Sequence, residues 1–305
     1  MKRPPQATTI PARARSDLEI KRANIRHHDV EAIIFDGVHP EGSSIYEISE
    51  IKKNLKTIVN KNNERELCID IGCGTGFLTD YELPLYTYVI ALDISSNMIK
   101  TIRKKLSFSD CLNLIQGDAE NLPIRQEVAD LISISSVLHH VPKPFNAISE
   151  ISRVLKKGGC IYITREPNQT KVRRIFTFID QHIIKKIALL VNKNNTRIYS
   201  ENDILKYGLD YNTADVHLPT GLNIVDITAI LTSKSFQIIT AYSYHWLFSD
   251  YKLKSTRDFI SKINYFIKKI PCAHSLGRYI NIIAQKRDNK FSRARAQVPP
   301  LIQSN

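Results

Sequence analysis

The sequence predicts an α/β domain built on a doubly wound, mostly parallel sheet of seven strands, with helical segments attached to it. Two observations support this prediction. Short apolar segments alternate with helical segments, and the segments with strand character are apolar throughout, which is typical of a parallel sheet covered by helices on both faces. The chain has 305 residues, of which 43% are hydrophobic and 24% charged. This composition fits one large or two modest globular domains and excludes a coiled coil, a collagen and a wholly disordered chain.

The strands of this sheet are expected at seven short aliphatic runs. Five runs up to residue 164 alternate with helical segments, of which residues 97–106 and 144–155 are the clearest. A helix capped by Asn223 and ending near Lys234 precedes the sixth run, and a helix at residues 256–270 separates the last two. The predicted strands are residues 67–71, 88–92, 112–116, 131–135, 160–164, 236–244 and 279–285.

Other segments are expected to flank or interrupt the sheet. Residues 1–25 begin with prolines and lack apolar periodicity, so we expect a disordered arm. Residues 26–62 fit two helices around a turn, which would form a helical lid ahead of the core at residues 63–166. The remaining expected segments are a basic helical insertion at 167–220, the end of the sheet at 221–286 with a helical insertion at 248–276, and a basic disordered tail at 287–305.

The formal net charge of +13 is concentrated in the second part of the chain. Residues 1–166 carry 22 Lys and Arg against 21 Asp and Glu, whereas residues 167–305 carry 21 against 9. This asymmetry favours a neutral core joined to an element that meets an anionic partner, although a solvated face has the same composition.

The compartment and redox state follow from simple patterns. The apolar runs fall far short of the ~20 residues that cross a bilayer, and the basic, Pro-rich N-terminus lacks the apolar region of a secretory signal. We therefore expect a cytoplasmic protein. Its five cysteines show neither a disulfide framework nor zinc-ligand spacing, so no metal site is predicted.

The strongest chemical signal is a glycine-rich loop at residues 70–76, with the sequence DIGCGTG, between an apolar strand and a helix. Its glycines allow a tight turn and let a ligand approach the backbone N–H groups, although a purely structural turn needs the same residues. The next strand ends in Asp93, where a carboxylate can accept hydrogen bonds from both hydroxyls of a ribose. Phe77 occupies the last position of a G-x-G-x-x-G fingerprint, which disfavours a dinucleotide.

At these residues the sequence resembles the class I S-adenosylmethionine-dependent methyltransferases, in particular the small-molecule enzymes of the type 11 family. The likeness extends in register over residues 64–166, with Lys157 in place of a usual proline. The matching segments are residues 67–76, 91–95 followed by Met98, 116–123, 135–142 and 153–159. The resemblance implies a Rossmann-like methyltransferase fold and S-adenosyl-L-methionine as cofactor.

The resemblance also implies a binding role for each matching position. Asp93 would hold the ribose, Asp118 would read the adenine amino edge, and Asp70 would orient the glycine loop or meet the amino group of the methionine part. The residues implied to bind the cofactor are Asp70, Gly72, Gly74, Gly76, Asp93, Ile94, Asp118, Ala119 and Ser135.

Methyl transfer of this kind is an in-line displacement, which can be accelerated largely by positioning in a dry pocket. A base is needed only when the acceptor must lose a proton, and His139 and His140 at the end of the fourth strand are the candidates. Either histidine could instead cap or pack the turn before Pro142. The residues that could close over the acceptor are His28, Phe35, His39 and His217.

The acceptor is predicted to be a small or lipid-like molecule. The fourth strand lacks the turn that marks base-amine methyltransferases, and Cys160 has the setting of a core residue rather than of a nucleophile. Residues 172–191 and 256–270 mix aliphatic and basic side chains, as does a helix lying on an anionic membrane surface or one packed on its own sheet. Basic residues without interleaved aromatics disfavour nucleic acid.

Two other functions fit parts of the pattern. A nicotinamide-dependent oxidoreductase would use a related sheet, but Phe77 and the segment around Asp118 speak against it. A protein that binds S-adenosylmethionine without turnover would keep the same motifs. The acceptor atom and the oligomeric state stay open.

Overall fold

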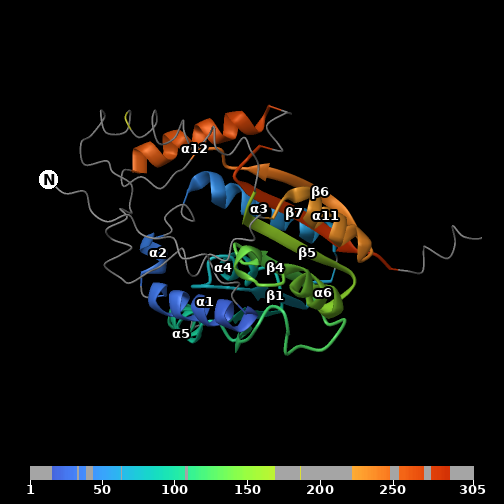
Figure 1. Cartoon of the computed structure of the whole chain (residues 1–305). Helices are drawn as coiled ribbons and strands as arrows, with labels where there is room; N and C mark the ends of the chain where they lie inside the picture. Colours follow the sequence, from blue (N-terminus) through green and yellow to red (C-terminus); the bar gives the residue numbers. More distant parts are fainter. Residues whose placement is uncertain are drawn as a thin grey trace, which may run out of the picture.

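The computed structural model of the chain describes residues 16–32, 34–38, 44–62, 64–106, 109–168, 186, 222–247, 254–270 and 276–288. Its centre is one seven-stranded sheet with the order β3-β2-β1-β4-β5-β7-β6 (Figure 1). The strands are β1 (Leu67–Ile71), β2 (Tyr88–Asp93), β3 (Leu112–Gln116), β4 (Ala129–Ser135), β5 (Leu155–Pro167), β6 (Phe236–Tyr244) and β7 (Tyr279–Lys286). Strands β1 to β5 pair in parallel and β7 is antiparallel to both of its neighbours, so the predicted mostly parallel sheet is confirmed.

The strand order places a switch point at the centre of the sheet. From β1 the chain builds outward to β2 and β3, then returns to the other side of β1 with β4 and continues to β5. Connections on the two sides run over opposite faces, so a crevice forms beyond the carboxyl ends of β1 and β4.

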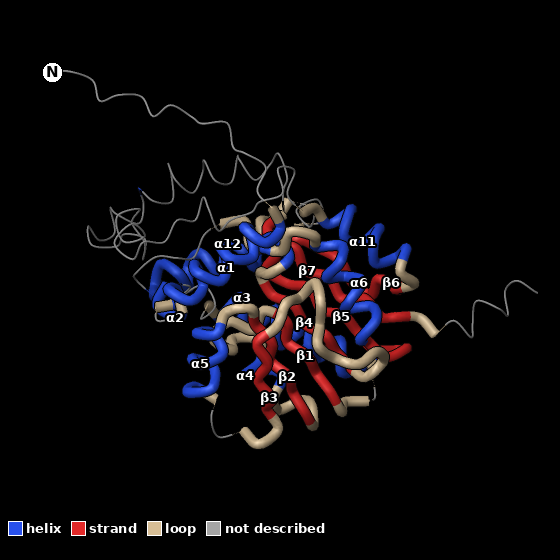
Figure 2. Tube along the Cα trace, turned by 60° about the horizontal axis from the view of Figure 1, so that its bottom comes forward, coloured by secondary structure: helices blue, strands red, loops and turns tan. Residues whose placement is uncertain are grey.

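Helices cover both faces of the sheet (Figure 2). The side chains of each buried strand point alternately to the two faces and are apolar on both, so each face packs against helices. Ile69 and Ile71 of β1 pack with α6 and α11 on one face, whereas Cys68 packs with α3 on the other. The helices are α1 (Asp17–Glu31), α2 (Phe35–Val38), α3 (Ile45–Lys61), α4 (Thr79–Glu82), α5 (Ser96–Lys105), α6 (Pro144–Val154), α11 (Ile224–Ser233) and α12 (Lys254–Lys268). None of the described helices is long and apolar enough to cross a bilayer.

The prediction of a disordered arm over residues 1–25 is wrong from Ser16 onward. Helix α1 begins there with a capping box: Ser16 Oγ accepts a hydrogen bond from the Glu19 backbone N–H, and the Glu19 carboxylate accepts one from the Ser16 N–H at 2.7 Å. The buried face of α1 includes Asn24, His27 and Glu31, so it carries no apolar periodicity that a sequence could show. Residues 1–15 lie outside the described part of the chain.

Other predictions also fall outside the described residues. They concern residues 169–185 and 187–221, which make up most of the expected basic insertion, and residues 289–305 of the expected tail. His39 and His217, two of the predicted lid residues, also lie outside the described residues.

Candidate active site

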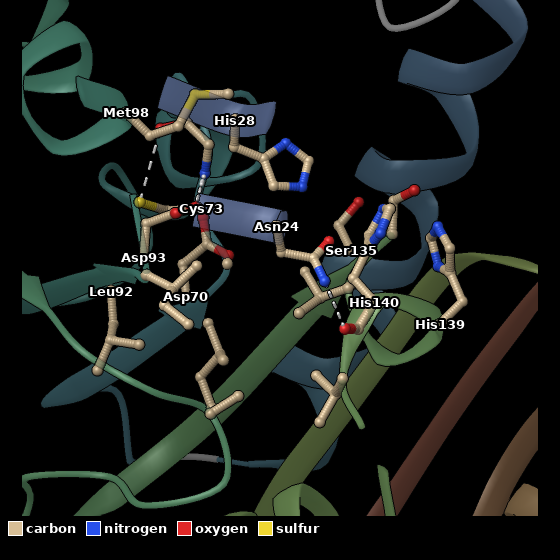
Figure 3. Close-up of a pocket in the computed structure, with 18 of the residues that line it drawn as sticks. Asn24, His28, Asp70, Cys73, Leu92, Asp93, Met98, Ser135, His139 and His140 are labelled. Atoms are coloured by element: carbon tan, nitrogen blue, oxygen red, sulfur yellow. Dashed lines mark hydrogen bonds between the residues drawn. The ribbon is translucent and has the colours of Figure 1, made fainter. Parts of the chain in front are cut away.

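A cavity of about 380 Å³ lies at the carboxyl ends of β1, β2 and β4, against α1 (Figure 3). This is the position at which open parallel sheets bind ligands. Eight of the residues predicted to bind the cofactor line it: Asp70, Gly72, Gly74, Asp93, Ile94, Asp118, Ala119 and Ser135.

The loop after β1 depends on glycine at two positions. Gly72 has φ +67°, and a Cβ atom there would lie 2.2 Å from Val137 Cγ2, inside the contact distance of any side chain. Gly74 has φ +53° and faces the ring of Phe35, which would lie 3.8 Å from a Cβ. The loop therefore presents backbone without side chains at the cavity wall, and the Phe35 ring of α2 lies next to Gly74.

Gly76 was predicted to bind the cofactor, but in the structure it contacts helix α5. It does not line the cavity. A Cβ at Gly76 would lie 2.8 Å from Ile102 Cδ1 of α5, at a backbone φ of +89°. Gly76 thus allows the loop to pack closely against α5 and shapes the site only indirectly.

Asp70 presents a buried carboxylate to the cavity (Figure 3). Its Oδ2 accepts a hydrogen bond from Thr79 Oγ1 at 2.6 Å, and within the described residues its Oδ1 has no hydrogen-bond partner. Burial raises the pKa of Asp70 to about 7, with a smaller contribution from the nearby Asp93 charge. A buried acceptor with an unused oxygen is suited to a cationic group such as an ammonium.

Asp93 is held rigidly at the end of β2. Its Oδ2 accepts the Gly74 N–H at 2.9 Å and its Oδ1 accepts the Ser95 N–H at 2.8 Å. Burial raises the pKa of Asp93, while these backbone hydrogen bonds and the charge of His28 oppose the rise. Each carboxylate oxygen has two acceptor sites, so both can accept a further hydrogen bond from a pair of hydroxyls.

Lys21 of α1 joins the site beside Asp118, although no sequence pattern predicts it there. Its Nζ lies 2.7 Å from Asp118 Oδ2 and 2.9 Å from Glu120 Oε2. Burial opposes its charge, but hydrogen bonds to the two carboxylates outweigh that effect and raise the pKa of Lys21. With residues 1–25 expected to be disordered, nothing in the sequence indicated that this lysine would reach the third strand's loop.

His139 is paired with Glu166, a second site residue that was not predicted from the sequence. Glu166 is fully buried near the end of β5 and lies 2.8 Å from His139 Nδ1. The same carboxylate accepts the backbone N–H groups of Val137 and Leu138 at 2.7 and 2.8 Å. With Glu166 ionised, Nδ1 is the donor, and Nε2 of a neutral imidazole is then the acceptor. Glu166 follows Arg165 at the polar end of β5, and a single glutamate there has no spacing pattern by which it could have been found.

Two other predicted histidines, His28 and His140, lie at the same cavity. The His139 and His140 ring centroids are 4.0 Å apart, and the His28 ring meets His140 edge-on at 5.1 Å. Phe35 also lines the cavity, so two of the four predicted lid residues are placed there.

Helix α1 is fixed over the cavity by hydrogen bonds to separate loops. Asp29 Oδ1 accepts from Ser95 Oγ at 2.6 Å, and Asn97 Nδ2 donates to the Asp29 carbonyl at 3.0 Å. Asn24 Nδ2 donates to the His140 carbonyl at 3.1 Å (Figure 3). The helix thus links the loop that follows β2 to the loop that follows β4.

Comparison with known proteins gives a methyltransferase domain in the central part of the chain. Residues 69–163 match a family model described as a methyltransferase domain. A demethylmenaquinone methyltransferase of Clavibacter sepedonicus is 28% identical over 150 residues, which cover 48% of this chain and 61% of that protein. An uncharacterised chloroplastic methyltransferase of Arabidopsis thaliana is 26% identical over 167 residues, with coverage of 48% and 47%.

The fold has solved counterparts at low sequence identity. The [4+2]-cyclase SpnF shares it with a TM-score of 0.54 at 13% identity, covering 86% of this chain and 94% of that one. This chain spans about half the length of the curated relatives it matches. The matched family model shows a methyltransferase domain at residues 69–163, the part of the chain that forms the switch point of the sheet and much of the cavity wall.

Proposed function

We propose that this protein transfers a methyl group from S-adenosyl-L-methionine to a small or lipid-like acceptor. The observation that carries the proposal is the placement of Asp70, Asp93 and Asp118 in one cavity at the switch point of the sheet. The three carboxylates are spread along the wall in the order in which the sheet presents β1, β2 and β3. Each matches one polar part of the cofactor.

The residues present fit the cofactor. The unused Oδ1 of Asp70 would receive the ammonium of its methionine part, and Asp93 would hold the ribose hydroxyls. Asp118, next to Ala119, would face the adenine edge. When bound, the cofactor supplies an electrophilic methyl group on a sulfonium.

His139 is proposed as the base that takes a proton from the acceptor. Glu166 orients its ring through Nδ1 and stabilises the imidazolium that forms, because a fully buried carboxylate interacts strongly with a nearby positive charge. The side chain of His139 is 12% exposed and lines the cavity, so its ring is within reach of a bound acceptor.

The acceptor is proposed to be a hydroxylated aromatic ring. The relative from Clavibacter sepedonicus acts, by its name, on demethylmenaquinone. Beyond the loop after β1, the cavity wall is rich in flat or aliphatic side chains, as a ring acceptor requires. These are Phe77, Val137, Val141, Pro142, Pro167 and Tyr279.

Helix α12 is proposed to rest on an anionic membrane surface from which a lipid-like acceptor enters. Asn264 fixes its inner face by accepting the Trp246 N–H at 2.9 Å. On its outer face Phe259 is 59% exposed and Phe266 65% exposed, and the exposed Lys262 and Lys269 alternate with them. Aromatic and basic side chains on one helical face are typical of interfacial helices.

The catalytic part is tested with S-adenosylmethionine labelled in its methyl group and reduced naphthoquinols as acceptors. We expect labelled product with the wild type, and a kcat lowered about 10²- to 10⁴-fold in His139→Gln, the range of general-base catalysis. S-adenosylhomocysteine should bind this variant as it binds the wild type. Glu166→Gln should lower kcat in the same direction.

Two results would overturn the proposal. If S-adenosylhomocysteine binds but no naphthoquinol is methylated, the acceptor class is wrong. If His139→Gln retains the wild-type kcat on an accepted quinol, another group takes the proton or none does.

A further inference from the structure

We infer that His27, His28 and Glu31, in the last turns of α1, form a binding site for one divalent transition-metal ion in the wall of the cavity. The inference goes beyond the proposed methyl transfer and does not depend on it. It rests on helical spacing, on the distances between the three side chains and on their burial.

The spacing puts the three side chains on one face of the helix. Glu31 lies four residues after His27 and three after His28, and residues three and four apart are neighbours on a helix surface. On the helical wheel Glu31 falls between the two histidines, one turn further along. Its carboxylate can therefore meet both imidazoles from the same side.

The distances match the coordination sphere of a small ion. Glu31 Oε2 lies 3.1 Å from His28 Nδ1 and 3.7 Å from His27 Nε2, and the three ligand atoms all lie within 4.8 Å of one another. Tetrahedral ligands bound at ~2.0–2.1 Å are separated by roughly 3.3 Å, a value that the two measured edges bracket. Small movements of the imidazoles would close the third edge around an ion.

The donor set selects the class of metal. Two imidazole nitrogens and one carboxylate suit Zn²⁺, Co²⁺ or Fe²⁺, whereas Mg²⁺ and Ca²⁺ prefer oxygen ligands alone. The side chains of His27 and Glu31 are 4% and 2% exposed, so a bound ion would compensate a carboxylate that burial otherwise penalises.

The position of the site gives the ion access to ligands. His28 has a side chain that is 20% exposed and points into the cavity, where its ring lies 5.1 Å from that of His140 (Figure 3). All three ligand residues line the cavity. An ion held by three protein ligands keeps an open position for water or for an oxygen atom of a bound molecule, whose pKa it would lower.

The test is a titration of metal-free full-length protein with Co²⁺, read by its visible d–d absorption, followed by displacement with Zn²⁺. We expect saturation at one Co²⁺ per chain, spectra of tetrahedral or five-coordinate cobalt, and a rise in Tm on binding. His28→Gln and Glu31→Gln should each weaken binding by more than the about 10- to 100-fold that outer-sphere changes cost. The matched change His139→Gln, in the same cavity, should leave it intact.

Three results would overturn the inference. They are no saturable binding, binding that survives both ligand substitutions unchanged, and binding that His139→Gln abolishes. Glu31 is buried, so its substitution could unfold the protein, and thermal unfolding of each metal-free variant checks that the variant is folded. The less buried His28 provides a second substitution at the site. Binding of S-adenosylhomocysteine, measured on the same samples, reports separately on the methyltransferase function.

Discussion

At the scale of single residues, the cavity is organised by carboxylates whose surroundings differ. Asp93 is satisfied by two backbone N–H groups and Asp118 by Lys21, whereas Asp70 has one oxygen that is bonded to Thr79 and one that is not bonded within the described residues. Of the three, Asp70 has the most to gain from a cationic ligand.

This difference predicts that cofactor binding depends on pH through Asp70. Burial raises its pKa to about 7, so in the free protein the carboxyl is largely protonated at pH 6 and largely ionised at pH 8. A ligand ammonium favours the ionised form and lowers this pKa on binding. The affinity for S-adenosylhomocysteine should therefore rise about tenfold from pH 6 to pH 8.

Calorimetric titration at several pH values measures this effect. Asp70→Asn should bind more weakly at pH 8 and lose the pH dependence, whereas Asp118→Asn, a matched change in the same cavity, should bind more weakly but keep it. A flat profile in the wild type, or an unchanged slope in Asp70→Asn, would show that Asp70 does not receive the ammonium.

At the scale of elements, the sequence predicted what depends on apolar pattern and missed what depends on isolated polar contacts. All seven strands form where the aliphatic runs stand, and α11 begins after Asn223, which caps it as expected. The part of α1 before residue 26 was missed, because the buried face of this helix turns polar after Ala23, at Asn24, His27 and Glu31. These polar residues face a ligand cavity rather than a hydrophobic core, and no periodicity can reveal such a face.

The same distinction explains which residues of the site could be predicted from the sequence. The glycine loop and Asp93 could be predicted because their spacing relative to the strands has a chemical meaning, and Asp118 because its segment resembles that of the class I methyltransferases. Lys21 and Glu166 could not, since both act through contacts with residues far away in the sequence. Lys21 meets Asp118 and Glu120, and Glu166 meets the segment 137–139 that includes His139. Gly76 was predicted to bind the cofactor because of its position in the motif, but the structure shows that its contact with α5 is what requires a glycine.

Helix α12 gives a prediction at this scale. Replacing Phe259 and Phe266 together by serine should weaken binding to anionic vesicles by at least about tenfold, because each buried phenylalanine contributes roughly 1.5–3 kcal/mol. Vesicle flotation at low salt measures the bound fraction. Phe145→Ser is the matched control, since Phe145 is 49% exposed on α6, away from α12 (Figure 1).

Either of two outcomes would contradict membrane docking by α12. One is that the wild type does not float with anionic vesicles. The other is that the double variant floats as well as the wild type, in which case the basic charge acts elsewhere on the surface.

At the scale of the whole molecule, polar contacts hold the layers around the sheet. Glu47 of α3 is buried and accepts a hydrogen bond from Tyr244 Oη of β6 at 2.8 Å, and it lies 3.4 Å from His245 Nδ1. Burial opposes its charge, but His245, Arg165 and Tyr244 outweigh that effect and lower the pKa of Glu47. Since Arg165 also lines the cavity, this buried cluster ties the α3 layer and the far edge of the sheet to the site.

The most direct test of the cofactor site is calorimetric titration of the full chain with S-adenosylhomocysteine, with NADH and the Asp93→Asn variant as controls. We expect one S-adenosylhomocysteine bound per chain, no binding of NADH, and an affinity at least about tenfold lower in Asp93→Asn, which loses a charge-assisted pair of hydrogen bonds to the ribose. Folded protein that binds NADH instead, or that binds neither ligand, would contradict the assignment of this cavity to S-adenosylmethionine.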